Sequence, residues 1–127
     1  MDLKSTEPVS FLYAADRDRA LGFYRDKLGL ALRSSDPFGD FIGMDNAVIR
    51  LTVMPDYKAG QHPVFGWNVS DIRTTVHALR DKGVAFTIYD GMGQDEDGVW
   101  TAPGGMAKVA WFNDPDGNVL SLSQTRI

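Results

Sequence analysis

The sequence contains no cysteine among its 127 residues, so the fold uses no disulfide and the chain has no thiol nucleophile or thiolate metal ligand. It also contains no apolar run approaching the roughly 18 residues of a membrane span, and no basic-then-apolar segment of the kind that begins a secretory leader. An excess of basic residues is missing as well, since the formal net charge is -4. We therefore expect a cytoplasmic protein with neither a membrane nor a nucleic acid as its partner.

The composition is otherwise that of an ordinary globular protein, with 43% hydrophobic and 24% charged residues. A chain of this length is large enough to bury roughly two thirds of its unfolded surface without staples. We therefore expect a single domain that covers residues 1–127.

One pattern occurs twice in the sequence. In each half, a short apolar run is followed by an aspartate and then by a helical pattern that ends in Arg-Asp-Lys. Asp16 and Asp71 are 55 residues apart, and so are Arg25 and Arg80. Two unrelated segments have little reason to share one offset, so we infer an internal duplication. Two equivalent modules tend to pack about a pseudo-two-fold axis, with a concave site lined by matched positions of each half.

Each module is expected to contain a strand, a helix and three further strands, which gives an α+β fold. Asp16 and Asp71 are expected to cap the helices, because a carboxylate accepts hydrogen bonds from the free amides of the first turn. Gly29 and Gly83 are expected to end them, because a left-handed residue costs glycine little. The expected strands are 9–14, 30–34, 38–44, 47–54, 64–69, 84–89, 106–113 and 119–124. Module one spans about 7–55, the linker about 56–63 and module two about 64–127.

Alternation along the strands predicts which side chains lie opposite the helices. On the strand 47–54, Ile49 and Leu51 are expected to meet the helix, which leaves Arg50 on the other face. On the two strands that open the modules both faces are apolar, so either assignment is open there. The preferred assignment makes the predicted cleft aromatic and rich in hydroxyl groups. Its members are Val9, Phe11, Tyr13, Val48, Arg50, Thr52, Val64, Gly66, Asn68, Val119, Ser121 and Ser123.

Two runs of sequence carry a family resemblance. They are residues 16–24 (DRDRALGFY) with the following 28–30 (LGL), and residues 111–120 (WFNDPDGNVL). With these runs the chain resembles the vicinal-oxygen-chelate superfamily, which contains glyoxalase I, bleomycin-resistance proteins, fosfomycin-resistance enzymes and extradiol dioxygenases. The resemblance implies two tandem βαβββ modules whose curved mixed sheets enclose a cleft, the glyoxalase/bleomycin-resistance-like fold. It also implies a small-molecule ligand and a homodimer, in which a cleft can borrow residues from the second chain.

The metal-dependent members of this superfamily hold a divalent ion with His and Glu side chains from the first and last strands of each module. The matching positions in this chain are Val9, Arg50, Val64 and Ser121. Valine offers no lone pair, serine is a poor ligand for a divalent ion, and arginine is a fixed cation. We therefore expect no metal at these positions and no cofactor.

Arg50 is the sharpest candidate for a functional residue. It is either a solvated strand residue or a cleft residue that needs an anion, because an unpaired buried guanidinium costs several kcal/mol. The anion is either internal, with Glu96 or Asp95 folding over from a later loop, or it is a carboxylate or phosphate of a ligand. The sequence leaves both alternatives open.

Residues 90–105 have no counterpart in the first module. This glycine-rich, acidic segment is either a lid over the cleft or a surface loop. Trp100 favours the lid, because a large aromatic side chain in a polar loop packs against the protein or a flat ligand. On the strand that follows, Trp111 is expected in the core and Lys108 in solvent.

Three functions fit these observations. The favoured one is a metal-independent small-molecule-binding protein whose ligand is aromatic, anionic or both. Its predicted ligand-binding residues are Phe11, Tyr13, Arg50, Asn68, Trp100 and Ser121. The second is a lyase, isomerase or dioxygenase with a rebuilt active site, in which Tyr13, Glu96 or Lys108 transfers protons. The third is a dimeric interaction module with a vestigial cleft.

Overall fold

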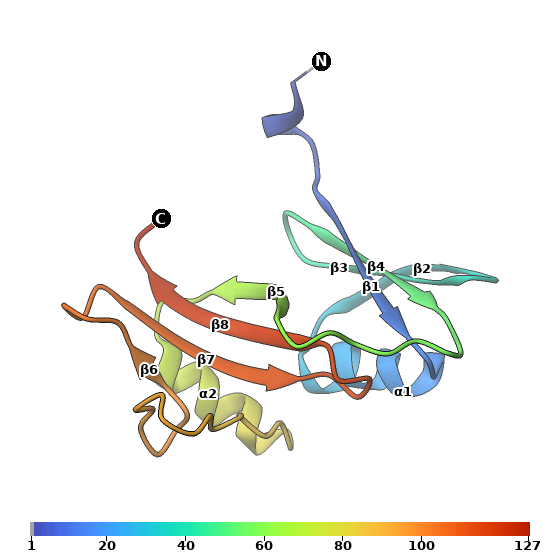
Figure 1. Ribbon diagram of the computed structural model, residues 1–127. Coiled ribbons are helices and arrows are strands. Elements are labelled where there is room, and N and C mark those ends of the chain that lie inside the picture. Colours follow the sequence, from blue (N-terminus) through green and yellow to red (C-terminus); the bar gives the residue numbers. More distant parts are fainter. Residues whose placement is uncertain (1) are drawn as a thin grey trace. The chain divides into compact units, whose positions relative to one another are not determined.

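The computed structural model describes residues 2–127, which form two four-stranded mixed sheets. The chain divides into two compact units, and the division between Lys58 and Ala59 falls inside the expected linker. Each unit runs strand, helix, then further strands, with the helix on one face of its own sheet (Figure 1). The expected α+β fold of two tandem βαβββ modules is confirmed.

The sheet of unit 1 has the strand order β1-β4-β3-β2. Strands β1 and β4 are parallel, whereas β2, β3 and β4 form an antiparallel meander. A short 3-10 turn, η1 (Leu3–Ser5), precedes the sheet. The other elements are β1 (Val9–Ala14), α1 (Arg17–Leu21), the π-helix η2 (Gly22–Lys27), β2 (Ala31–Asp36), β3 (Gly39–Gly43) and β4 (Val48–Val53). The four expected strands are present, with their ends shifted by up to two residues.

Helix α1 continues into a π-helix because the first module holds one residue more than the second at this point. In unit 1 the amide of Leu30 closes the helix end on the carbonyl of Tyr24, whereas in unit 2 the amide of Val84 closes it on Leu79. The first closure spans one more residue than the second, and Leu28 has no counterpart before the second glycine. A π-turn is the usual way in which a helix absorbs a single inserted residue.

The sheet of unit 2 has the strand order β5-β8-β7-β6, with β5 parallel to β8. Its helix begins as expected, because the carboxylate of Asp71 accepts a hydrogen bond from the amide of Thr74. Helix α2 lies against β7 and β8 and covers one face of the sheet (Figure 1). The elements are β5 (Pro63–Asn68), α2 (Ile72–Asp81), β6 (Trp100–Thr101), β7 (Ala107–Asn113) and β8 (Val119–Thr125).

The expected strand 84–89 is wrong. This segment makes one isolated bridge, between Phe86 and Phe112, and pairing with β7 is taken up by β6 instead. The reason lies in the side chain of Gln94, which donates to the carbonyl of Thr87 and accepts from the amide of Tyr89. One amide side chain thus satisfies backbone groups that a neighbouring strand would otherwise have paired.

The cores of the two units lie between each helix and the sheet face that it covers. Every second residue of the central strands is buried on that side, and each such aliphatic side chain contributes about 1.5–3 kcal/mol relative to exposure. In unit 1 the buried residues include Leu12, Ala14, Ile42, Ile49 and Leu51, and in unit 2 they include Ala110, Phe112, Leu120 and Leu122. The opposite side of each sheet, which we call the helix-free face, carries the residues predicted for ligand binding. Among residues 2–127, no helix is long and apolar enough to cross a membrane.

Candidate functional site

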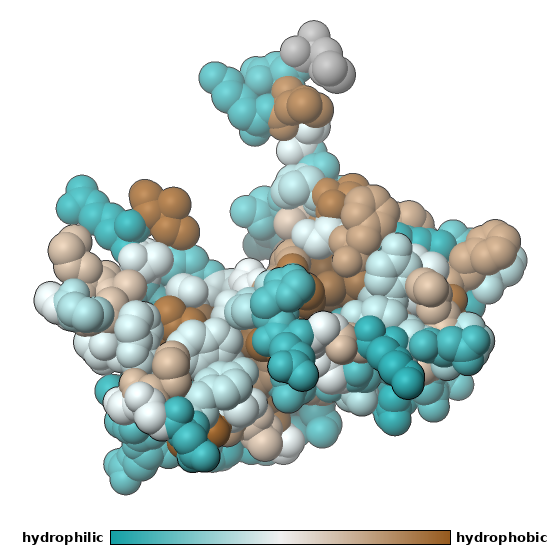
Figure 2. All heavy atoms as spheres, in the orientation of Figure 1, coloured by the Kyte–Doolittle hydropathy of each residue, from teal (hydrophilic) through white to brown (hydrophobic). Residues whose placement is uncertain are grey.

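The helix-free face of unit 1 carries a row of side chains that crosses three strands. Strand register places Phe11 of β1 beside Arg50 of β4, and Arg50 beside Phe41 of β3. The neighbouring row begins with Tyr13 and Thr52. Phe11 is 65% exposed and Tyr13 is 37% exposed, and Figure 2 shows apolar surface exposed around β1. An arginine set between two phenylalanines is therefore the centre of this face.

Arg50 is held by a carboxylate and by an aromatic ring. Its Nη2 donates to Oδ1 of Asp36 at 2.9 Å, and its guanidinium carbon lies 4.6 Å from the centre of the Phe41 ring. Of the two alternatives left open by the sequence, an internal anion is present, but it is Asp36 at the end of β2 and not Asp95 or Glu96. The other nitrogen, Nη1, is buried and has no hydrogen-bond partner among residues 2–127. An unpaired buried donor costs about 1–3 kcal/mol, so this nitrogen favours any acceptor that can reach it.

Asp36 is fixed by the tight turn between β2 and β3. Its Oδ1 accepts the amides of Phe38 and Gly39 as well as Arg50. The hydrogen bond from Arg50 and these backbone amides hold the pKa of the Asp36 carboxyl below its usual range. Asp36 therefore stays ionised at neutral pH, and Arg50 is oriented without any ligand.

A second ion pair supports the same turn from the helix side of the sheet. Nη2 of Arg17 donates to the carbonyls of Asp36 and Gly39 and to Oδ1 of Asp40, at 2.7, 2.9 and 2.9 Å. Asp40 is 1% exposed and also accepts from Ser35. Burial works to raise the pKa of the Asp40 carboxyl, but the hydrogen bonds from Arg17 and Ser35 outweigh burial and lower it. The turn that presents Asp36 is thus anchored to α1.

The helix-free face of unit 2 carries an aromatic cluster. The rings of Trp100 and Trp111 have centres 6.5 Å apart, and Tyr89 meets Trp111 edge to face at 5.7 Å. Trp111 was expected in the core, but it is only half-buried and alternates with Ala110 and Phe112, which face α2. The prediction failed because both faces of β7 are apolar, so alternation alone gives no sign of which face meets the helix.

Ser121 and Asn68 have different roles on this face. Ser121 pairs with Gly66, and its hydroxyl lies where a Cβ on residue 66 would be, so this arrangement requires glycine at that position. Asn68, also predicted to bind ligand, uses its amide inside the fold instead. It donates to the carbonyl of Thr125 at 2.9 Å and accepts from the Thr125 amide at 3.0 Å, extending the ladder between β5 and β8.

The two proton-transfer candidates of unit 2 do not share the face of the aromatic cluster. Lys108 points to the opposite face of β7 from Val109 and Trp111. It lies near Asp71 at the start of α2. The pKa of the Asp71 carboxyl is lowered mainly by the hydrogen bond from the Thr74 amide, and the charge of Lys108 lowers it further. Glu96 is exposed and lines a hollow with Arg80 behind the sheet.

The residues at the expected metal positions do not fit a divalent ion. Val9 and Val64 are aliphatic, and Arg50 donates to Asp36 and would repel a cation. Ser121 alone offers an oxygen. Among residues 2–127, no group of three or more His, Asp or Glu side chains is arranged to hold a metal ion elsewhere.

Two residues of unit 1, Asp36 and Phe41, were missed from the sequence. Phe41 had a usable signal: a tight turn at residues 45–46 between the two expected strands places Phe41 opposite Arg50, which the observed register confirms. Asp36 had none, because an aspartate before a turn is common and its contact with Arg50 reaches from the end of β2 to β4. In unit 2, Tyr89 was missed because its segment was expected to be a strand.

A duplicated βαβββ architecture with one aromatic-rich, helix-free face in each module defines the class of glyoxalase/bleomycin-resistance-like proteins. The chain belongs to the Glyoxalase/Bleomycin resistance protein/Dioxygenase superfamily, whose profile matches residues 7–122.

Three known proteins illustrate how this chain relates to others. YurT of Bacillus subtilis (strain 168), an uncharacterized protein, is 27% identical over 135 residues, covering 91% of this chain and 96% of YurT. The bleomycin resistance determinant encoded on transposon Tn5 is 18% identical, with a TM-score of 0.73 and 94% and 97% of the two chains covered. TnmS3, an antibiotic binding protein from Streptomyces sp. CB03234, is 22% identical, with a TM-score of 0.68 and 96% and 97% covered. Both structural likenesses concern the fold.

Proposed function

We propose that this protein binds a small molecule without a metal and does not transform it, and that the ligand is aromatic and carries an oxygen acceptor, either neutral or anionic. The observation that carries the proposal is Arg50: it lies in a row with Phe11 and Phe41, and its Nη1 lacks a partner among residues 2–127. Aromatic neighbours suit a flat ligand, and a guanidinium N–H suits its oxygen.

The charge of Arg50 does not by itself demand an anionic ligand. Asp36 already matches that charge, so an anion would have to compete with an ionised carboxylate at 2.9 Å. A carbonyl or hydroxyl oxygen would satisfy Nη1 without this repulsion. The proposed ligands therefore include both anionic aromatic compounds and neutral aromatic compounds that carry a carbonyl or hydroxyl oxygen.

Two relatives support binding as the function. The structures of the Tn5 bleomycin resistance determinant and of the antibiotic binding protein TnmS3 share this fold. We extend the proposal to a homodimeric, cytoplasmic protein, and sedimentation velocity would test the dimer.

The alternative is an enzyme of the same superfamily with a rebuilt active site. It would depend on Tyr13, Glu96 or Lys108, but Glu96 and Lys108 lie behind the sheet that carries Trp100 and Trp111. Product formation from a bound compound that falls when Glu96→Gln is introduced, while binding persists, would favour the enzyme over the binder.

A thermal-shift screen tests the binding proposal. The panel contains aromatic carboxylates, aryl phosphates, neutral aryl ketones and glycopeptide antibiotics, and a ligand at about 100 times its Kd stabilises by about 2.7 kcal/mol. The shift is expected to vanish in Arg50→Met and to remain in Arg33→Met, which removes an exposed arginine paired with Glu7. An unchanged shift in Arg50→Met would place the ligand elsewhere and overturn the proposal.

A further inference from the structure

The loop of residues 90–99, which we call loop 90–99, joins two of the three aromatic rings on the helix-free face of unit 2. Tyr89 precedes the loop and Trp100 follows it, and both rings contact Trp111 of β7. Trp111 lies on β7 and the backbone of Trp100 on β6, which pairs with β7, whereas Tyr89 lies outside the strands. The conformation of loop 90–99 therefore bears most directly on Tyr89, and on the side chain of Trp100 where the loop enters β6.

Hydrogen bonds within the loop tie its two ends together. In the side chain of Gln94, Oε1 accepts a hydrogen bond from the backbone amide of Tyr89 at 2.7 Å, and Nε2 donates one to the carbonyl of Gly98 at 2.8 Å. Oδ1 of Asp95 accepts from the amides of Asp97 and Val99 at 2.9 and 3.0 Å. These contacts make the loop a stiff unit, but they do not fix it against the sheet.

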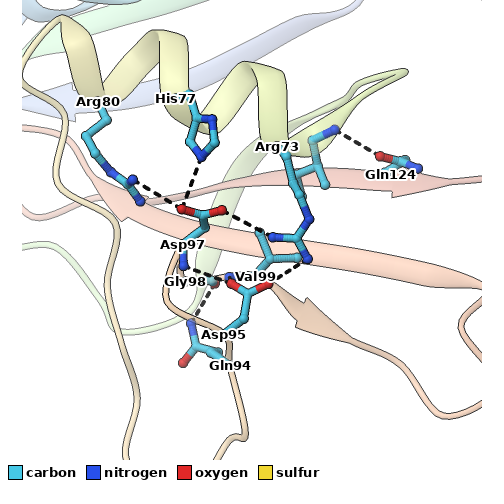
Figure 3. A network of polar contacts seen from close by, with 10 residues as sticks. Arg73, His77, Arg80, Gln94, Asp95, Asp97, Gly98, Val99 and Gln124 are labelled. Carbon is cyan, nitrogen blue, oxygen red and sulfur yellow. Dashed lines mark hydrogen bonds and ion pairs between the residues drawn. The ribbon is translucent and has the colours of Figure 1, made fainter.

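The segments on either side of the loop pair with β7, and a cluster of charges attaches the middle of the loop to α2. Arg73, His77 and Arg80 lie on one side of the helix and point toward Asp97 (Figure 3). Their nitrogens lie 3.2, 3.1 and 3.2 Å from its carboxylate oxygens, and Arg73 also reaches Asp95 at 2.6 Å. We call these five residues the clamp.

Asp97 is the centre of the clamp because it joins three helix side chains. Its side chain is 13% exposed, whereas those of the three helix residues are 44 to 57% exposed. The hydrogen bond from His77, followed by that from Arg80, lowers the pKa of the Asp97 carboxyl. Isolated exposed ion pairs contribute little, but several that converge on one sheltered carboxylate act together.

We propose that Asp97 is a positioning residue for the aromatic cluster of unit 2: by fastening loop 90–99 to α2, it sets how the rings of Tyr89 and Trp100 lie against Trp111. The inference rests on the proposed function for its consequence on affinity, but not for its consequence on ring geometry. The loop is thus not a free lid over the site, because its middle is bound behind the sheet while its ends supply the rings in front.

The test compares Asp97→Asn with two other variants. Arg73→Met breaks the clamp from the helix side and should reproduce the effect if Asp97→Asn folds poorly. Asp90→Asn, an exposed aspartate in the same loop and outside the clamp, removes the same charge and serves as the matched control.

The first readout needs no ligand. The rings of Trp100 and Trp111 are close and inclined by 44°, so their coupled transitions give an exciton signal in far-ultraviolet circular dichroism, which Trp100→Phe should abolish. Asp97→Asn and Arg73→Met are expected to weaken this signal, and Asp90→Asn to leave it intact. An intact signal in both clamp variants would show that the clamp does not position the rings.

The second readout is the affinity for a compound of the thermal-shift panel whose binding is weakened by Trp100→Phe, which shows that the compound depends on the aromatic cluster of unit 2. Both clamp variants are expected to bind it about tenfold more weakly, equivalent to about 1.4 kcal/mol. A weakened exciton signal with unchanged affinity would overturn the role of Asp97 in ligand binding. If no compound of the panel binds the wild-type chain, the proposed function fails, whereas the exciton comparison still decides the positioning role.

Discussion

Nη2 of Arg50 donates to Oδ1 of Asp36 across 2.9 Å, at a position where the chelating members of the superfamily are expected to hold a metal ligand. In the proposed metal-independent site, a cation that already has its counter-ion would stand where those members offer a carboxylate or an imidazole. Nη1 of the same side chain is buried and has no hydrogen-bond partner among the described residues. An oxygen acceptor that reaches Nη1 between Phe11 and Phe41 would supply the missing hydrogen bond.

Arg50→Met should change the stability of the fold little, with a Tm within about 5 °C of the wild type. Methionine keeps most of the apolar stem, the unpaired Nη1 disappears, and the carboxylate of Asp36 is 41% exposed and can be solvated. Thermal unfolding followed by circular dichroism measures the effect. A loss of cooperative unfolding would mean that the pair is needed for folding rather than for binding.

Asp40→Asn should destabilise the protein by about 1–3 kcal/mol, because it removes a charged acceptor that is almost wholly buried. The pKa of the Asp40 carboxyl is lowered in the folded state, so its contribution is present above about pH 4 and is lost as the pH falls through the lowered pKa. Urea denaturation from pH 7 down to pH 3 should show a smaller loss of stability in Asp40→Asn than in the wild type. Parallel pH profiles would show that Asp40 is not the group responsible.

Gly66→Ala should be destabilising by about 1–3 kcal/mol, because the new Cβ would meet the hydroxyl and the carbonyl of Ser121 on the adjacent strand. Gly60→Ala is the matched control, since its nearest neighbours there would be His62 atoms at 3.7 Å. Chemical denaturation of both variants checks the difference. Equal stabilities would indicate that β5 and β8 can move apart at no cost.

Dialysis against a chelator should leave both the Tm and ligand binding unchanged, because Val9, Val64 and Arg50 supply no metal ligand. Elemental analysis of protein purified without chelator is the direct measurement. A stoichiometric transition metal whose removal lowers the Tm would contradict the metal-independent proposal.

Local rules were sufficient for most of the fold. Asp16 and Asp71 cap their helices as expected, because capping involves groups only three residues apart. The strand 84–89 was wrong because the side chain of Gln94, which lies outside it, takes over its backbone groups. Strand propensity is read from the residues of the segment itself, so it cannot predict that a side chain outside the segment will hydrogen-bond to its backbone.

The candidate site was predictable where it depends on alternation and hairpin register. These rules place Arg50 opposite the helix and Phe41 next to it. They could not supply Asp36 as its counter-ion, nor Trp111 as a member of the aromatic cluster. The Asp36–Arg50 pair and the Trp100–Trp111 contact each join residues of different strands, and they form only when the folded sheet brings those residues together.

The sequence by itself determined the duplication and the βαβββ order, because each follows from residue type and spacing along the chain. Only the tertiary structure decided the partner of Arg50 and the attachment of loop 90–99 to α2. An ion pair forms between whichever opposite charges the folded backbone brings within about 4 Å. Asp36, Asp95, Glu96 and Asp97 are chemically alike in the sequence, and the path of the chain alone assigns Asp36 to Arg50 on the helix-free face of unit 1 and Asp97 to α2.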